Sequence, residues 1–137
     1  MTRILVAVDD SSGGVSAART AVRLAALTGG HIRAITVESD GIVAESGSGA
    51  GASEADRGRA ALDFVRDLAA DHGIRIETDH LQGRPALVIL DDATAWRADY
   101  IVVGRTGRHR IGEHFIGADA QHVLEFAEVP VVVVPSP

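Results

Sequence analysis

Five short apolar runs alternate along this chain with four segments of helical periodicity. The first run, at 3–8, is apolar nearly throughout, which is typical of a strand buried on both faces of a sheet. Strands that alternate with helices indicate a parallel sheet with helices on both of its faces. The pattern therefore predicts an α/β fold, with strands at 3–8, 32–37, 74–81, 100–103 and 129–134.

The helical segments are bounded by residues that start helices. Ser11 or Ser12 is placed to cap the first helix, and the pair Ser53 and Asp56 is typical of the start of the second. Pro85 lies near the first turn of the third, where its missing N–H costs nothing. The expected buried stripes are Val15, Ala18, Val22 and Ala25; Ala61, Val65 and Leu68; Ala86, Ile89, Leu90 and Ala93; and Ala120, Val123, Leu124 and Ala127.

Length and composition bound the class of protein. At 137 residues the chain has the size of a single domain, which we expect to span residues 1–137. No apolar run approaches the roughly 20 residues needed to cross a bilayer. The first residues are interpreted as the opening strand rather than as a signal peptide. We therefore expect a cytoplasmic protein that does not insert into a membrane.

The chain has neither cysteine nor lysine, and each of these absences excludes a class of chemistry. Without cysteine there is no disulfide, no Cys-ligated zinc and no thiol catalysis. All 13 basic residues are arginine, which excludes a Walker-type P-loop, a Schiff-base lysine and the kinase lysine. The net charge of −6 argues against non-specific binding to nucleic acid, because such binding depends on neutralising phosphates.

Three other patterns do not indicate a site. The segment 40–52 has glycines at alternating positions and is typical of a flexible loop; no strand leads into it, so it is not a dinucleotide fingerprint. The three histidines after residue 105 lack the spacing of metal ligands, and we expect them at the surface. We expect Trp96, at a helix end, to serve in packing.

A glycine loop follows the fourth apolar run. Glycines stand at Gly104, Gly107 and Gly117, where a helical pattern begins. Glycine lets a backbone bend sharply or approach a ligand, and a helix start offers unpaired N–H groups with positive partial charge. The pattern therefore indicates an anion-binding loop, unless the glycines serve turn geometry alone. The loop also carries basic side chains that suit phosphate, namely Arg105, Arg108 and Arg110.

Four segments, taken in order, resemble those of one protein family. They are ILVAVDDSS, GRPALVILDDATAWRADYIVVG, the G-x2-G-x9-G spacing of the glycine loop, and the tail VPVVVVP. On these segments the chain resembles the universal stress protein family nearly from end to end. The resemblance implies a Rossmann-like, adenine nucleotide alpha hydrolase-like domain. Its single parallel sheet would have the order 3-2-1-4-5, with the first and fourth strands side by side.

The resemblance also implies an adenine nucleotide site. In ATP-binding members, the residue matching Asp9 and the backbone beside it contact adenine, and the residue matching Val37 lines that pocket. From the residues alone, Asp9 is also a candidate for a helix cap, and Asp10 for a turn. The implied cofactor is ATP, and the implied site residues are Ala7, Val8, Asp9, Val37, Val103, Gly104, Arg105, Gly107, Arg108, Gly117, Ala118 and Asp119.

The chain departs from the family pattern just after Gly117. The family's Ser or Thr is Ala118 here, and Asp119 and Ala120 follow it. Two hydroxyl donors for phosphate are therefore absent, and losing one hydrogen bond to a charged group costs about 1.5–3 kcal/mol. Asp119 also adds a like charge beside the site. Three roles are open for Asp119: it caps the helix, it ligates Mg²⁺ beneath a nucleotide, or it does neither.

These features predict a universal stress-type protein that binds an adenine nucleotide weakly and acts as a regulatory module. No general base is evident against a nucleophile, so we expect no efficient catalysis, although slow ATP hydrolysis stays open. The alternative is a nucleotide-free dimeric interaction protein of the same fold, which Ala118 and Asp119 favour. A third interpretation is an enzyme of the ATP pyrophosphatase type. Such an enzyme needs a glycine-rich pyrophosphate-binding loop after the first strand, and the segment DDSSGG resembles one only weakly.

The last apolar run suggests a partner. From Val129 to Val134 it forms an apolar edge strand, and such edges tend to pair. Members of the resembled family pair this strand antiparallel with its copy, which implies a homodimer. The alternative is a monomer in which Pro130 and Pro135 block the pairing.

Overall fold

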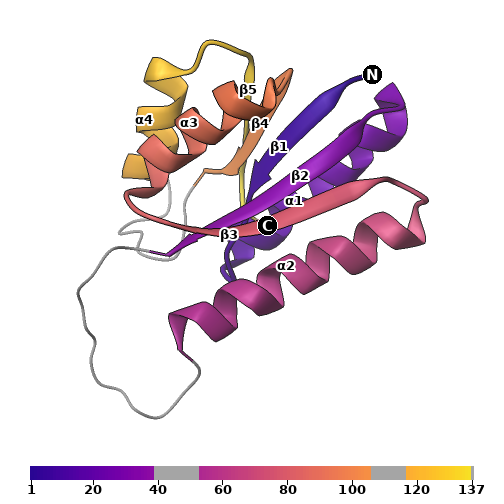
Figure 1. Cartoon of the computed structure of the whole chain (residues 1–137), viewed down its shortest axis with the longest axis horizontal. Helices are drawn as coiled ribbons and strands as arrows, with labels where there is room; N and C mark the ends of the chain where they lie inside the picture. The colour runs from indigo at the N-terminus through magenta and orange to yellow at the C-terminus, as the bar shows by residue number, and fades with distance from the viewer. Residues whose placement is uncertain (39–52, 106–116, 137) are drawn as a thin grey trace.

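A five-stranded parallel sheet runs through the molecule in the order β3-β2-β1-β4-β5 (Figure 1). The computed structural model describes residues 1–38, 53–105 and 117–136. The expected strand order is therefore confirmed, whereas the predicted flexible loop at 40–52 lies outside the described residues. The elements are β1 (Arg3–Ala7), α1 (Ser12–Thr28), β2 (His31–Glu38), α2 (Glu54–Asp71), β3 (Ile76–Gln82), α3 (Pro85–Trp96), β4 (Tyr100–Gly104), α4 (Ala118–Phe126) and β5 (Val131–Val134).

Helices cover both faces of the sheet, with α1 and α2 on one face and α3 and α4 on the other (Figure 1). Alternate residues of β1 supply the two cores: Ile4 and Val6 pack toward α1 and α2, and Leu5 packs toward α3 and α4. All three side chains are fully buried. The central strand is therefore apolar on both sides, as the sequence pattern predicts.

The helix starts follow the capping pattern. Ser11 is the N-cap of α1, and its hydroxyl accepts a hydrogen bond from the N–H of Gly14. Ser53 caps α2 by accepting from the N–H of Asp56 at 3.1 Å. Pro85 is the first residue of α3, in agreement with the prediction.

Some details of the prediction are wrong. Leu124 is 46% exposed instead of lying on the buried stripe of α4, because this helix contacts the sheet mainly through Ala120 and Val123. Strand β5 begins at Val131, two residues later than expected. Strand β3 begins at Ile76 rather than at 74 and extends to Gln82.

A charged cluster that the sequence analysis missed joins α3 to the sheet. Arg33 of β2 donates to both carboxylate oxygens of Asp92 on α3, at 2.7 and 2.9 Å. Its guanidinium also binds Glu77 and Asp79 of β3, at 2.9 and 3.1 Å. The side chains of Arg33 and Asp92 are only 13% and 14% exposed. Because both are largely withdrawn from water, their pairing is a specific tie between layers.

The hydrogen bond that Arg33 donates to Asp92 raises the pKa of Arg33 against the opposing effect of burial, and the bonds that it donates to Asp79 and Glu77 add to the rise. A raised folded-state pKa means that the cationic form stabilises the fold below the pKa of the unfolded chain. The tie therefore persists throughout the neutral pH range.

Replacing Asp92 tests this tie. Asp92→Asn should lower the free energy of unfolding by about 1–3 kcal/mol, because it leaves Arg33 without its best-oriented carboxylate. The adjacent Asp91 is exposed, so Asp91→Asn makes the same charge change and should stay within about 0.5 kcal/mol of wild type. Urea unfolding monitored by circular dichroism measures both, and equal effects would contradict the assignment.

Candidate nucleotide site

The candidate site lies where the winding of the sheet reverses. Strands β1 and β4 are parallel neighbours, with Val6 opposite Val102. The chain passes from β1 into α1 on one face, whereas α4 follows β4 on the other face. Ligands of open α/β sheets bind at the carboxyl ends of strands at such a point. The geometry therefore brings the segment after β1 close to the segment after β4, as predicted.

The residues after β1 form a small hydrogen-bonded cap. Oδ1 of Asp9 accepts from the backbone N–H of Ser11 at 3.0 Å and also from the Ser11 hydroxyl. That hydroxyl in turn accepts from the N–H of Gly14 at 3.0 Å. Asp9 thus holds the N-cap of α1 through one oxygen, while Oδ2 makes no hydrogen bond within the described part of the chain. The helix-cap role and a ligand-binding role are therefore compatible.

Glycines let the start of α1 approach β4. A Cβ added to Gly104 would lie 2.8 Å from the carbonyl oxygen of Gly13, and one added to Gly14 would lie 2.3 Å from that of Asp9. Both distances are shorter than real Cβ contacts, so these positions exclude any side chain. Gly104 was expected in an anion-binding loop, and its contact with the start of α1 was not predicted; nor was the part played by Gly13 and Gly14. Two successive glycines inside a predicted first helical turn were the available signal.

Arg105 connects the end of β5 to the start of α4. Its N–H donates to the carbonyl of Val134 at 2.7 Å, and its carbonyl accepts from the N–H of Gly117 at 2.7 Å. Its Nε is buried and has no hydrogen-bond partner among the described residues. Buried donors are normally paired, and a guanidinium is suited to phosphate. Arg105 therefore offers an unused donor next to a helix start.

The start of α4 has no side-chain cap. Gly117 is its N-cap and supplies no side-chain hydrogen bond, while Ala118 and Asp119 are exposed. Asp119 lies in the first turn of α4, where the helix dipole favours a carboxylate, and it makes no hydrogen bond within the described residues, so its capping role stays a prediction. The terminal N–H groups of α4 have no side-chain cap from the N-cap residue and could meet an anion.

The remaining candidate residues have unequal roles. Val8 and Val103 are 6% and 5% exposed and pack in the two cores. Because their side chains are buried, they could contact a ligand only through backbone atoms. Ala7 and Val37 pack at the edge of the core beneath α3 and α4. The predicted positions Gly107 and Arg108 lie outside the described residues.

The sequence of the chain is similar to known proteins over nearly its whole length. The model of the universal stress protein family matches residues 1–135. A universal stress protein of Methanocaldococcus jannaschii is 33% identical over an alignment that covers 98% of this chain and 82% of that protein. The chain belongs to the universal stress protein family.

Solved structures share the fold of this universal stress protein. UspA from Lactobacillus plantarum has a TM-score of 0.82 at 24% identity and covers 97% of each chain. A family protein from Arabidopsis thaliana with AMP bound has a TM-score of 0.72 at 21% identity, covering 100% of this chain and 93% of that one. Matched structures also include a complex with cAMP and an Archaeoglobus fulgidus complex with dAMP, at TM-scores of 0.76 and 0.67.

Arg57, which also was not anticipated from the sequence, borders the site of this universal stress protein. Arg57 of α2 reaches Asp10, the residue after Asp9, with its Nε 3.7 Å from the carboxylate. The predicted turn position Asp10 therefore also contacts α2. The pairing of Arg57 could not be recognised from the neighbouring sequence, because its partner lies more than 40 residues away along the chain.

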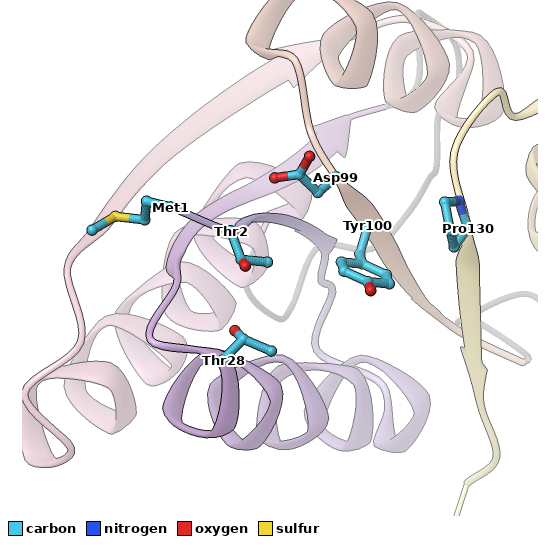
Figure 2. A pocket seen from close by; sticks show the side chains of 6 residues that line it. All are labelled: Met1, Thr2, Thr28, Asp99, Tyr100 and Pro130. Carbon is cyan, nitrogen blue, oxygen red and sulfur yellow. The ribbon is translucent and has the colours of Figure 1, made fainter.

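A hollow at the opposite end of the sheet is not part of this site. It lies at the amino ends of the strands and is lined by Met1, Thr2, Thr28, Asp99, Tyr100 and Pro130 (Figure 2). Asp99, which lines it, is already bound to the backbone N–H of Arg3 at 2.8 Å. Within the described parts of the chain, no group of His, Cys, Asp or Glu is placed to hold a metal, and no helix is long and apolar enough to cross a membrane.

His31 lies near that hollow and packs against Trp96. The two rings meet edge to face at 5.4 Å, and the guanidinium of Arg3 lies over the Trp96 ring. Trp96 therefore serves in packing, as expected. Burial lowers the pKa of His31, and the positive charges of Arg3 and Arg75 lower it further.

Substituting Gly104 tests the approach of α1 to β4. Gly104→Ala should cost about 1–3 kcal/mol of unfolding free energy, since Gly13 must move to admit the methyl group. Ser12→Ala changes an exposed residue of the same contact region and should stay within about 0.5 kcal/mol of wild type. Urea unfolding measures both changes, and an unaltered midpoint for Gly104→Ala would refute the close contact.

The lowered pKa of His31 predicts a pH dependence of stability. The folded state favours neutral His31, so this contribution is complete above pH 6.5 and is lost as the pH falls through that value toward the lower folded-state pKa. His31→Gln should flatten the dependence of the urea midpoint between pH 7.5 and 5, approximate limits chosen to bracket the titration. An equally steep dependence in His31→Gln and in wild type would contradict the assignment to His31.

Proposed function

We propose that this universal stress protein binds an adenine nucleotide at the carboxyl ends of β1 and β4 and acts as a regulatory module without efficient catalysis. The observation that carries the proposal is Arg105, whose buried Nε has no partner among the described residues. It stands beside the uncapped start of α4. An unpaired cationic donor and free helix N–H groups are complementary to a phosphate.

The other side of the site fits the nucleoside. Asp9 keeps Oδ2 free of hydrogen bonds within the described residues, and a carboxylate accepts from an amino or hydroxyl group. The close contact of Gly13 with Gly104 brings the segment after β1 next to the segment after β4, so that Asp9 and Arg105 lie on two sides of one candidate site. Family structures with AMP, cAMP or dAMP support an adenine nucleotide as the ligand class.

A regulatory role without efficient catalysis is supported by how the hydroxyl of Ser11 is used, one of those that the described residues place near the site. The Ser11 hydroxyl accepts from Gly14 while it donates to Asp9, so it is committed to the helix cap. Such a site can still act by binding a nucleotide that changes the order or the surface of the domain.

Calorimetric titration with ATP, ADP and AMP, each with and without Mg²⁺, tests the proposal. Arg105→Gln should weaken binding about tenfold or more, because a hydrogen bond to a charged group contributes about 1.5–3 kcal/mol. Arg75→Gln removes the same charge from an exposed position before β3 and should bind as wild type does. No heat at millimolar nucleotide would instead favour the nucleotide-free interaction protein.

We also propose a homodimer through β5. Val134 directs its carbonyl to Arg105, and Pro130 directs its carbonyl to β4 as well. By alternation, Val131 and Val133 point their backbone groups away from β4, at the free edge of the sheet. Pro130 therefore does not occupy an outward pairing position, which favours the dimer over a blocked monomer.

Light scattering after size exclusion should give twice the mass of the chain. Val133→Pro removes an outward N–H and should yield a folded monomer, because edge strands tolerate proline when its missing N–H faces solvent. Val133→Thr keeps the N–H and should remain dimeric. A wild-type monomer at every concentration would exclude the dimer.

A further inference from the structure

We propose that Asp119 makes the site select nucleotides by their number of phosphates, so that a monophosphate binds better than ATP. The inference rests on the proposed nucleotide site and adds a specificity residue to it. Among the described residues, Asp119 is the acidic residue in the first turn of α4.

The position of Asp119 is the first observation. It is the second residue of α4, two positions after the N-cap Gly117, and it is exposed. Within the described residues its carboxylate makes no hydrogen bond or ion pair. A rise of about 1.5 Å per residue keeps it within the first turn, next to the free N–H groups that would meet a phosphate.

The balance of charge is the second observation. Among the described residues, Arg105 contributes one positive charge beside the site, and the start of α4 contributes about half of one. The negative charge of Asp119 opposes both. Each further phosphate adds negative charge that must lie near the same carboxylate, and like charges at short range repel. The cost of Asp119 therefore grows with the number of phosphates.

An alternative role for Asp119 makes the opposite prediction. If the carboxylate ligated Mg²⁺ beneath a triphosphate, it would favour Mg-ATP, since Mg²⁺ binds carboxylate and phosphate oxygens together. Removing the charge would then weaken Mg-ATP binding. The two roles therefore differ in the sign of a single measurable effect.

The experiment compares the ratio of the ATP and AMP dissociation constants in three proteins, in EDTA and in Mg²⁺. Asp119→Asn should lower the ratio about threefold or more by improving ATP binding, with a smaller gain for AMP. Glu125→Gln makes the same charge change at an exposed position near the end of α4 and should keep the wild-type ratio. Added salt should reduce the preference for AMP in wild type more than in Asp119→Asn.

Three results would overturn the inference. An unchanged ratio in Asp119→Asn, with both nucleotides still binding, removes the selectivity role and leaves the nucleotide site standing. Weaker Mg-ATP binding by Asp119→Asn assigns the carboxylate to a metal instead. Absence of binding of either nucleotide by all three folded proteins refutes the nucleotide site itself, and the selectivity role with it.

Discussion

The backbone contact between the start of α1 and the end of β4 is the constraint on which the candidate site depends. Gly13 and Gly104 meet without side chains, so the helix start lies directly beside the strand end. Asp9 and Ser11 lie just before the start of α1, and Arg105 follows Gly104 on the other side of the contact. A bulkier residue at Gly104 would separate the two halves of the site even if every polar group were retained.

A second constraint fixes the opposite layer. Arg33 binds Asp92 across the space between sheet and helix, and Asp92 lies in the second half of α3. The chain runs from α3 directly into β4, so the helix held by Arg33 precedes the strand that ends at Gly104. The ion pair between Arg33 and Asp92 is thus linked to the candidate site through the end of α3 and strand β4.

The strand pattern was sufficient to predict the sheet, because buried parallel strands are marked by apolar runs and helix starts by capping residues. The resemblance supplied the strand order. The position of Leu124 could not be predicted from periodicity, since a stripe of apolar residues does not tell how closely a nine-residue helix approaches the sheet. The pairings of Arg33 with Asp92 and of Arg57 with Asp10 also escaped prediction, because their partners are distant in sequence and charged residues are common at any surface.

The helix-cap role considered for Asp9 is observed, and it is compatible with the proposed role in nucleotide binding. Oδ1 is committed to Ser11, which orients the carboxylate and restricts its rotation. Oδ2 keeps its hydrogen-bonding capacity within the described residues. A ligand that binds an oriented carboxylate loses less entropy than one that must first order a mobile side chain. The cap of α1 therefore orients the acceptor that the proposed nucleotide site would use.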